Sequence, residues 1–378
     1  MSWELKKIGI CLDFYNGKTI KVDNNKGENP IYGSNGIIGS SSKFNYNDSI
    51  IVGRVGAYCG AVKREKGDFW ATDNTIVVKS KLNNDNDFWF YLLQNSNLNN
   101  YAGGSAQPLI TQGTLKELEF QIPSFPTQKR IASILSAYDD LIENNLKRIK
   151  LLEETAQNIY KEWFVHFRFP NYESMAFDGE SGLPVGWEMT KMDEVMQISG
   201  GGTPSTKEPN YWDGEILWFS PTDLGKNTSL ILLDSSKKIT NEGLSKSSAK
   251  LLPPMTILMS SRATIGLFGM LNKECSTNQG FINIIPNNVL LRYYILFNLI
   301  YRKHEIEANA SGTTFKEISK GVFKNMDIVE PNSDVANDFF KLCDNIFKQV
   351  ENIEIQNQKL KEARDILLPR LMNRTIEV

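Results

Sequence analysis

The second half of this chain repeats short motifs of the first half in the same order, and this duplication constrains the fold more than any other feature. Trp3-Glu4-Leu5 recurs as Trp187-Glu188-Met189 at an offset of 184 residues, and the motif at 113–116 recurs at 321–324, an offset of 208. Matches that keep their order over such a distance indicate a tandem repeat. The 378 residues are therefore predicted to form two related units, the second with 24 more residues between its motifs (208 minus 184).

Each unit is followed by a segment in which apolar residues recur in alternating steps of four and three, at 131–163 and again at 339–371. This spacing of 3.5 residues is typical of a coiled-coil seam. The segments follow Pro126 and Pro331, and they predict two helices of roughly 40 residues, each about 60 Å long.

Two units related by a pseudo-twofold axis require these helices to pair in antiparallel orientation. A register in which facing residue numbers sum to 502 matches apolar positions along the seam and places Asn145 opposite Asn357. A buried polar pair costs stability but fixes the register of a helix pair. We expect this register, and a shift by one heptad is the competing arrangement.

Short apolar, β-branched runs within each unit predict strands, at 49–52, 75–78, 256–259 and 281–284. One further helix is expected in each unit, at 87–98 and 289–307. The fold class is therefore α+β (mixed α/β), with two pseudo-twofold-related globular domains and two long helices that pair as an antiparallel coiled coil. The expected boundaries are domain 1 at 1–124, spacer helix 1 at 125–167, a linker at 168–185, domain 2 at 186–331 and spacer helix 2 at 332–378.

The sequence contains no recognisable catalytic or metal-binding motif. Its four cysteines are far apart, and its two histidines, His166 and His304, are distant from any candidate nucleophile. The glycines at 200–202 are better explained by a tight turn than by a phosphate loop, because GxxxxGK[ST] is absent. No catalytic or metal residues are therefore expected. No membrane span or signal peptide is evident, and a cytoplasmic protein is expected.

Several long motifs resemble those of one known family. They include Gln128-Lys129-Arg130-Ile131-Ala132-Ser133-Ile134-Leu135 at the start of the first long helix and the run Tyr160–Pro170 at its end. Others are Ser260–Gly266, Thr277-Asn278-Gln279-Gly280-Phe281 and Ala363–Met372. Over nearly its full length the chain resembles the specificity subunit of a type I restriction-modification system. The first unit lacks the triple-glycine and Trp-rich motifs of the second, so it looks like a shorter kind of recognition domain.

The resemblance implies that each domain is a target-recognition domain that reads one half of a bipartite sequence in double-stranded DNA. It also implies that the helices set the spacer and dock two modification (methyltransferase) subunits, with restriction motor-nuclease subunits as further partners. The chain would carry specificity without catalysis and without a cofactor of its own. S-adenosylmethionine, ATP and Mg would bind to the partner subunits.

Side chains suited to hydrogen bonding with base edges or phosphates fall at repeated positions or in divergent loops of the two units. Repeated residues can equally serve the scaffold, and for the two arginines phosphate contact or structural pairing is favoured over base reading. The candidates for DNA binding are Arg54, Asn74, Arg262, Asn278, Gln279, Asn35, Lys43, Gln107, Lys207 and Thr222.

Aromatic residues gather at the end of the first long helix: Tyr160, Trp163, Phe164 and Phe167. They are candidates for docking the modification subunits, although a local core is the more ordinary explanation. A coiled-coil scaffold that presents two protein-binding domains is the alternative function. A methyltransferase or nuclease with unrecognised motifs is a third possibility.

The net charge is −2, from 42 Lys and Arg against 44 Asp and Glu, and no segment is a basic block. A DNA-binding chain of this kind cannot rely on bulk positive charge. Weak DNA binding is therefore expected for the chain alone, and tight binding only in a complex with its partners.

Overall fold

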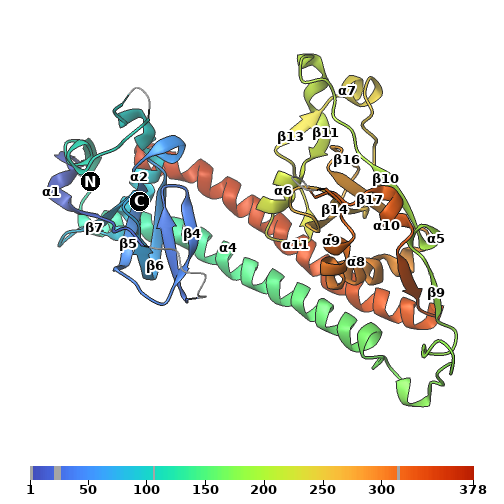
Figure 1. Cartoon of the computed structure of the whole chain (residues 1–378). Helices are drawn as coiled ribbons and strands as arrows, with labels where there is room; N and C mark the ends of the chain where they lie inside the picture. Colours follow the sequence, from blue (N-terminus) through green and yellow to red (C-terminus); the bar gives the residue numbers. More distant parts are fainter. Residues whose placement is uncertain (1–2, 21–26, 105–106, 313–315) are drawn as a thin grey trace. The chain divides into compact units, whose positions relative to one another are not determined.

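The structure is a computed structural model that describes residues 3–20, 27–104, 107–312 and 316–378. It divides into two compact units (Figure 1). The first comprises residues 1–142 and 359–378, and the second comprises residues 143–358. The long helices α4 (Phe125–Tyr160) and α11 (Ser333–Met372) each contribute residues to both units.

The first unit is built around a six-stranded sheet with the order β2-β7-β5-β6-β3-β4. A separate pair, β1 and β8, joins the two ends of the domain in antiparallel pairing. The strands are β1 (Glu4–Lys7), β2 (Leu12–Asn16), β3 (Asn29–Gly33), β4 (Gly36–Ser41), β5 (Tyr46–Gly53), β6 (Val62–Ala71), β7 (Thr75–Ser80) and β8 (Glu119–Ile122). The short helices are α1 (Ile8–Cys11), α2 (Asn86–Asn95) and α3 (Gln112–Lys116), with 3-10 turns at Gly56–Tyr58 and Leu98–Tyr101.

The second unit contains a sheet with the matching order β10-β17-β14-β15, to which β12 adds a fifth strand. The insertion of this unit, between Gly201 and Arg262, contains β11 and β13, which join β16 from outside the insertion in a three-stranded sheet of order β13-β11-β16. The strands are β9 (Glu188–Lys191), β10 (Met196–Gly200), β11 (Trp212–Phe219), β12 (Ile231–Leu232), β13 (Lys237–Ile239), β14 (Ile257–Ser260), β15 (Phe268–Leu271), β16 (Cys275–Thr277), β17 (Phe281–Pro286) and β18 (Asp327–Glu330). The short helices are α5 (Met192–Val195), α6 (Pro221–Lys226), α7 (Asn241–Ser245), α8 (Arg292–Tyr301), α9 (Lys303–Ala308) and α10 (Lys320–Lys324). The 3-10 turns lie at Tyr172–Ser174, Pro209–Tyr211 and Val289–Leu291.

The shared strand order confirms the mixed α/β repeat that the sequence predicts. The predicted helix at 289–307 is divided at Arg302 into α8 and α9. There, the Arg302 guanidinium donates to the Asp327 carbonyl oxygen and to both carboxylate oxygens of Glu305.

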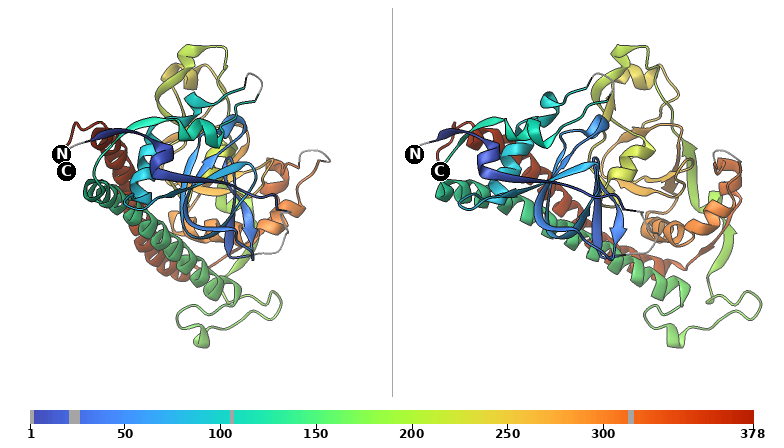
Figure 2. Two further views of the ribbon diagram at one scale, coloured as in Figure 1. Left: turned by 90° about the vertical axis from the view of Figure 1, so that its left-hand side faces the viewer. Right: turned by 60° about the vertical axis from the view of Figure 1, so that its left-hand side comes forward.

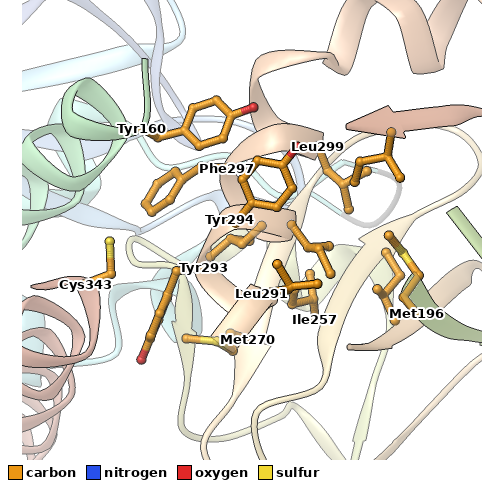
Figure 3. Close-up of a cluster of buried hydrophobic side chains, with 14 of the residues drawn as sticks. Tyr160, Met196, Ile257, Met270, Leu291, Tyr293, Tyr294, Phe297, Leu299 and Cys343 are labelled. Atoms are coloured by element: carbon orange, nitrogen blue, oxygen red, sulfur yellow. The ribbon is translucent and has the colours of Figure 1, made fainter. Parts of the chain in front are cut away.

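The core of the second unit joins the sheet, α8 and the long helices. Figure 3 shows Tyr293, Tyr294 and Phe297 of α8 between sheet residues such as Ile257 and the Cys343 side of α11. The aromatic rings pack closely, with Tyr293 stacked on Phe347 at 4.9 Å between centroids. The first unit has its own core, in which Trp89 and Phe88 of α2 are fully buried.

Within each unit the portions of α4 and α11 run antiparallel, as the coiled-coil pattern predicts. In the second unit they lie side by side in both views of Figure 2, and the Trp163 and Phe339 rings lie 5.7 Å apart. Asn145 and Asn357 are buried there and share a hydrogen bond of 2.9 Å, so they occupy the layer given by the sum of 502. In the first unit, Arg364 of α11 forms an ion pair with Asp139 of α4.

The expected linker at 168–185 is mostly exposed, but its two ends are anchored in the second unit's core. After α4, a π-helical turn at Lys161–Val165 ends the helical segment. Phe169 and Leu183 are then buried in the same cluster as Trp187, on which Phe169 stacks at 5.5 Å.

All four cysteines are buried as separate thiols. Burial raises the pKa of each thiol, to about 12 for Cys275. In the described parts of the chain, no helix is both long and apolar enough to cross a membrane.

Candidate nucleic-acid interface

In the first unit, candidate residues meet where β5 ends and β7 begins. Gly53 pairs with Thr75 across these strands, which places Arg54 and Asn74 side by side. The Arg54 backbone N–H donates to the Asn74 carbonyl oxygen at 2.9 Å. The Ser34 hydroxyl donates to the same oxygen at 2.8 Å, so the β3–β4 turn that contains Asn35 lies at this end of the sheet.

A small hairpin base closes over this end of the first sheet. Gly103 and Leu109 exchange two backbone hydrogen bonds of 2.9 Å, and the Ile110 N–H donates to the Arg54 carbonyl oxygen at 3.0 Å. Gln107 lies in this hairpin and is exposed. Four of the predicted residues therefore come together: Arg54, Asn74, Asn35 and Gln107.

The second unit repeats this hairpin base at an offset of 208, but Ser261 takes the place that Arg54 has in the first unit, and Arg262 is the next residue. Ser311 and Glu317 exchange backbone hydrogen bonds of 3.0 and 2.9 Å, and the Ile318 N–H donates to the Ser261 carbonyl oxygen at 3.0 Å. This hairpin base was missed in the sequence, although Ala102 and Gly104 recur as Ala310 and Gly312 and could have revealed it.

Arg262, Asn278 and Gln279 gather at the matching sheet end. The Asn278 side chain accepts a hydrogen bond of 2.8 Å from the Gly280 N–H, and a Cβ atom on Gly280 would lie 3.3 Å from Arg262 Nε. Such an atom would also meet the ring of Pro221 at 3.0 Å, so Thr222, the next residue, borders this group.

The glycine motif that precedes this site is fixed by close approach of two backbones rather than by a tight turn. A Cβ atom on Gly201 would lie 2.2 Å from the Thr277 carbonyl oxygen, and one on Gly17 would lie 1.9 Å from the Thr72 carbonyl oxygen. Glycine is therefore required at the same place in both units. This close approach brings Thr203 next to Gln279, and the Thr203 hydroxyl donates a hydrogen bond to the side-chain oxygen of Gln279.

A pocket of about 360 Å³ opens at this end of the second sheet. Its polar lining includes Gln279, Ser311, Glu317 and Lys320. Ser311 and Lys320 were not among the predicted residues, because nothing in their local sequence places them next to the end of β10.

Two predicted residues lie apart from these groups. Lys43 precedes β5, whereas Arg54 follows the last residue of that strand, and Lys207 is exposed in the segment between β10 and β11. No hydrogen bond among the described residues joins either one to the two sheet ends.

The arginines at the two sheet ends retain their capacity to bind an anion. In the described part of the chain, neither Arg54 nor Arg262 forms an ion pair or a side-chain hydrogen bond, and Arg54 Nε is shielded from solvent without a partner. Structural pairing with a carboxylate does not account for them. Guanidinium groups left free in this way are suited to phosphate or base-edge contacts.

Two of the four aromatic candidates for partner docking lie in the local core, which is the more ordinary explanation that the sequence offers. Tyr160 and Phe164 are buried, and Phe164 packs against Tyr294 and Phe339 at 4.7 and 4.9 Å. Trp163 and Phe167 are half-buried against the same core. Because their faces contact one another and α8, Tyr160 and Phe164 have no surface to offer a partner.

Comparisons with known proteins agree with this architecture. The family model for the type I restriction modification DNA specificity domain matches residues 2–154 and 184–363. The chain is 26% identical over 307 residues to the type I restriction enzyme MjaIX specificity subunit of Methanocaldococcus jannaschii, covering 76% of this chain and 68% of that one. It is 25% identical over 353 residues to the HindI specificity subunit of Haemophilus influenzae, covering 76% of each.

A solved structure shares the fold. The S subunit of a type I restriction-modification system from M. genitalium matches with a TM-score of 0.60 and 18% identity, covering 98% of this chain and 96% of that one. Because the family model matches both repeats, the chain belongs to the family of type I restriction-modification DNA specificity subunits.

Proposed function

We propose that this chain is the DNA specificity subunit of a type I restriction-modification complex and that each domain reads one half of a bipartite target. The repeated sheet end carries the proposal, because in each unit it has an arginine that lacks a side-chain partner among the described residues. Arg54 makes the main-chain hydrogen bonds of this frame in the first unit, whereas in the second unit Ser261 makes them and Arg262 is the next residue. Around that frame the side chains differ, with Asn35 and Gln107 in one unit and Thr203, Thr222 and Gln279 in the other. A shared frame with different linings suits a reader of two different half-sites.

The recognition domains correspond to residues 1–124 and 186–331, joined by the helices at 125–167 and 332–378. Within this division, Arg54 and Arg262 contact phosphates, because both halves of a duplex present the same backbone. The residues that differ between the units are the candidates for base edges. Lys43 and Lys207, which lie apart, serve as flanking backbone contacts.

The chain acts as a non-catalytic subunit. S-adenosylmethionine is held by two modification subunits, and ATP and Mg by restriction motor-nuclease subunits. The paired helices α4 and α11 are the common platform for the modification subunits, since their outer faces remain exposed along both units. A scaffold with two protein-binding domains is less well supported, because both sheet ends present free arginines rather than apolar surfaces.

Methylome sequencing tests the proposal. The chain is expressed with its modification partner in a host that lacks other adenine methylation, and a methylated motif in two parts separated by unspecified bases is expected. An active partner that produces no such motif would count against the proposed function.

A further inference from the structure

The first residue of α3 and the first residue of α10 occupy the same place in the two repeats but differ in chemistry. Gln112 and Lys320 are separated by 208 residues, and each lies over the end of the first strand of its sheet. Those strand ends, Asn16 and Gly200, are themselves separated by 184 residues. Asn16 pairs with Ile76 and Gly200 pairs with Ile282, so the two places are equivalent within the sheets.

In the first unit this place holds a closed pair of amides. The amide groups of Gln112 and Asn16 are hydrogen-bonded at 2.9 Å, with Asn16 exposed and Gln112 half-buried. The pair is neutral and carries both donors and acceptors, which is the chemistry that suits an adenine edge.

In the second unit the same place holds a single cation. A Cβ atom on Gly200 would lie 2.9 Å from Lys320 Nζ, so the glycine leaves the room that the ammonium group occupies. Lys320 is exposed, lines the pocket with Gln279 and Ser311, and has no ion pair among the described residues. Both positions therefore change between the units: the first unit has Asn16 and Gln112, and the second unit has Gly200 and Lys320.

From this coordinated difference we infer that positions 112 and 320 determine half-site specificity, with Lys320 contacting a guanine edge. The inference rests on the proposed function and adds to it a position that reads sequence. Both halves need phosphate contacts equally, and Arg54 and Arg262 already supply one arginine at each sheet end, neither with a side-chain partner among the described residues. A position that keeps its place but changes from amide to ammonium is instead suited to tell bases apart, and lysine is a donor to guanine O6 and N7.

The test compares Lys320→Gln, Gln112→Lys and Lys324→Gln in the full chain, each expressed with the modification partner and analysed by methylome sequencing. Lys320→Gln should lower discrimination for guanine at one position of one half-site by roughly tenfold to a hundredfold. Gln112→Lys should change one position of the other half-site. Lys324→Gln is the control, because both units have a lysine at this position, Lys116 in the first and Lys324 in the second. This variant should give the same methylated motif as the original chain.

The outcomes separate the inference from the function on which it rests. If the original chain gives a bipartite motif and Lys320→Gln gives the same motif, the inference is wrong, whether methylation is unchanged or uniformly slower at all sites. A uniform decrease would make Lys320 a phosphate contact. If the original chain gives no bipartite motif with an active partner, the proposed function itself fails.

Discussion

At the scale of single residues, the two units are distinguished by a few polar side chains on a common backbone. Arg54 is held by main-chain hydrogen bonds to Asn74 and Ile110, and in the second unit the residue before Arg262, Ser261, makes the matching bonds to Gly280 and Ile318. Neither arginine has a side-chain partner among the described residues. Because the backbone fixes their position, substitution of the side chain should alter binding without disturbing the fold.

Replacing Arg262 with alanine should weaken binding of the assembled complex to all DNA sequences by a similar factor. A phosphate contact carries no sequence information, so the slope of log affinity against log salt should fall by about one. Fluorescence anisotropy at several salt concentrations measures both quantities. Arg262→Lys is the matched control, since it keeps the charge and should retain most of the affinity. A change confined to one base position would make Arg262 a base reader.

The buried pair Asn145 and Asn357 provides a second prediction. Replacing either residue alone with leucine leaves a buried amide without its partner and should cost about 1–3 kcal/mol. The double substitution should cost less than the sum of the two, because no polar group remains stranded. Urea denaturation followed by far-UV circular dichroism gives the midpoints. Additive effects would show that the pair is not coupled.

At the scale of elements, one side chain links α4 to the insertion of the second unit. The Glu153 carboxylate accepts hydrogen bonds from the Leu230 N–H at 2.6 Å and from the Ser229 hydroxyl at 3.1 Å. Burial, with a smaller contribution from the nearby Glu354 on α11, raises the pKa of Glu153 to about 7 despite these hydrogen bonds.

This pKa gives a defined dependence of stability on pH. Because the folded carboxyl has the higher pKa, the folded state binds more protons than the unfolded state between about pH 4.5 and 7. Stability from this group is therefore present below that range and is lost as the pH rises through 7. Glu153→Gln should abolish the loss and stabilise the protein at pH 8 by about 1–2 kcal/mol. Urea midpoints at pH 5 and pH 8 for both proteins test this, and an equal pH dependence would contradict it.

Much of the fold is predictable from the sequence because the residue patterns that specify it recur at regular intervals. The seam spacing of 3.5 residues gives the long helices, and the repeated offsets give the two domains. The hairpin bases at 103–109 and 311–317 are held by a few backbone hydrogen bonds, which leave no periodic trace in side chains. The segment around Phe169 is predicted to be a linker because it contains several prolines and glycines and only two buried apolar residues.

The candidate site was only partly predictable for a similar reason. Arg54 and Asn74 could be found because they recur in both units. Lys320 could not, since its role depends on Gly200, 120 residues earlier in the sequence, leaving space beneath it. Such a contact, in which the Lys320 side chain occupies the space left by the absent side chain of Gly200, can be found only in the structure.

At the scale of the whole molecule, the balance of charge separates the isolated chain from the complex. With a net charge of −2, the chain alone should bind duplex DNA weakly, and the modification partner should tighten binding by at least tenfold. Binding isotherms with and without the partner at one salt concentration measure the difference. Tight binding by the isolated chain with a steep salt dependence would contradict the prediction.

The buried thiols have a practical consequence for such measurements. Because Cys11, Cys59, Cys275 and Cys343 are enclosed and burial raises the pKa of each, the thiolate that reacts with maleimides is scarce at neutral pH. A single cysteine introduced at an exposed position should therefore accept a fluorophore while the native four remain unlabelled. The natural sequence can serve as the background for site-specific spectroscopy, with no need to remove its own cysteines first.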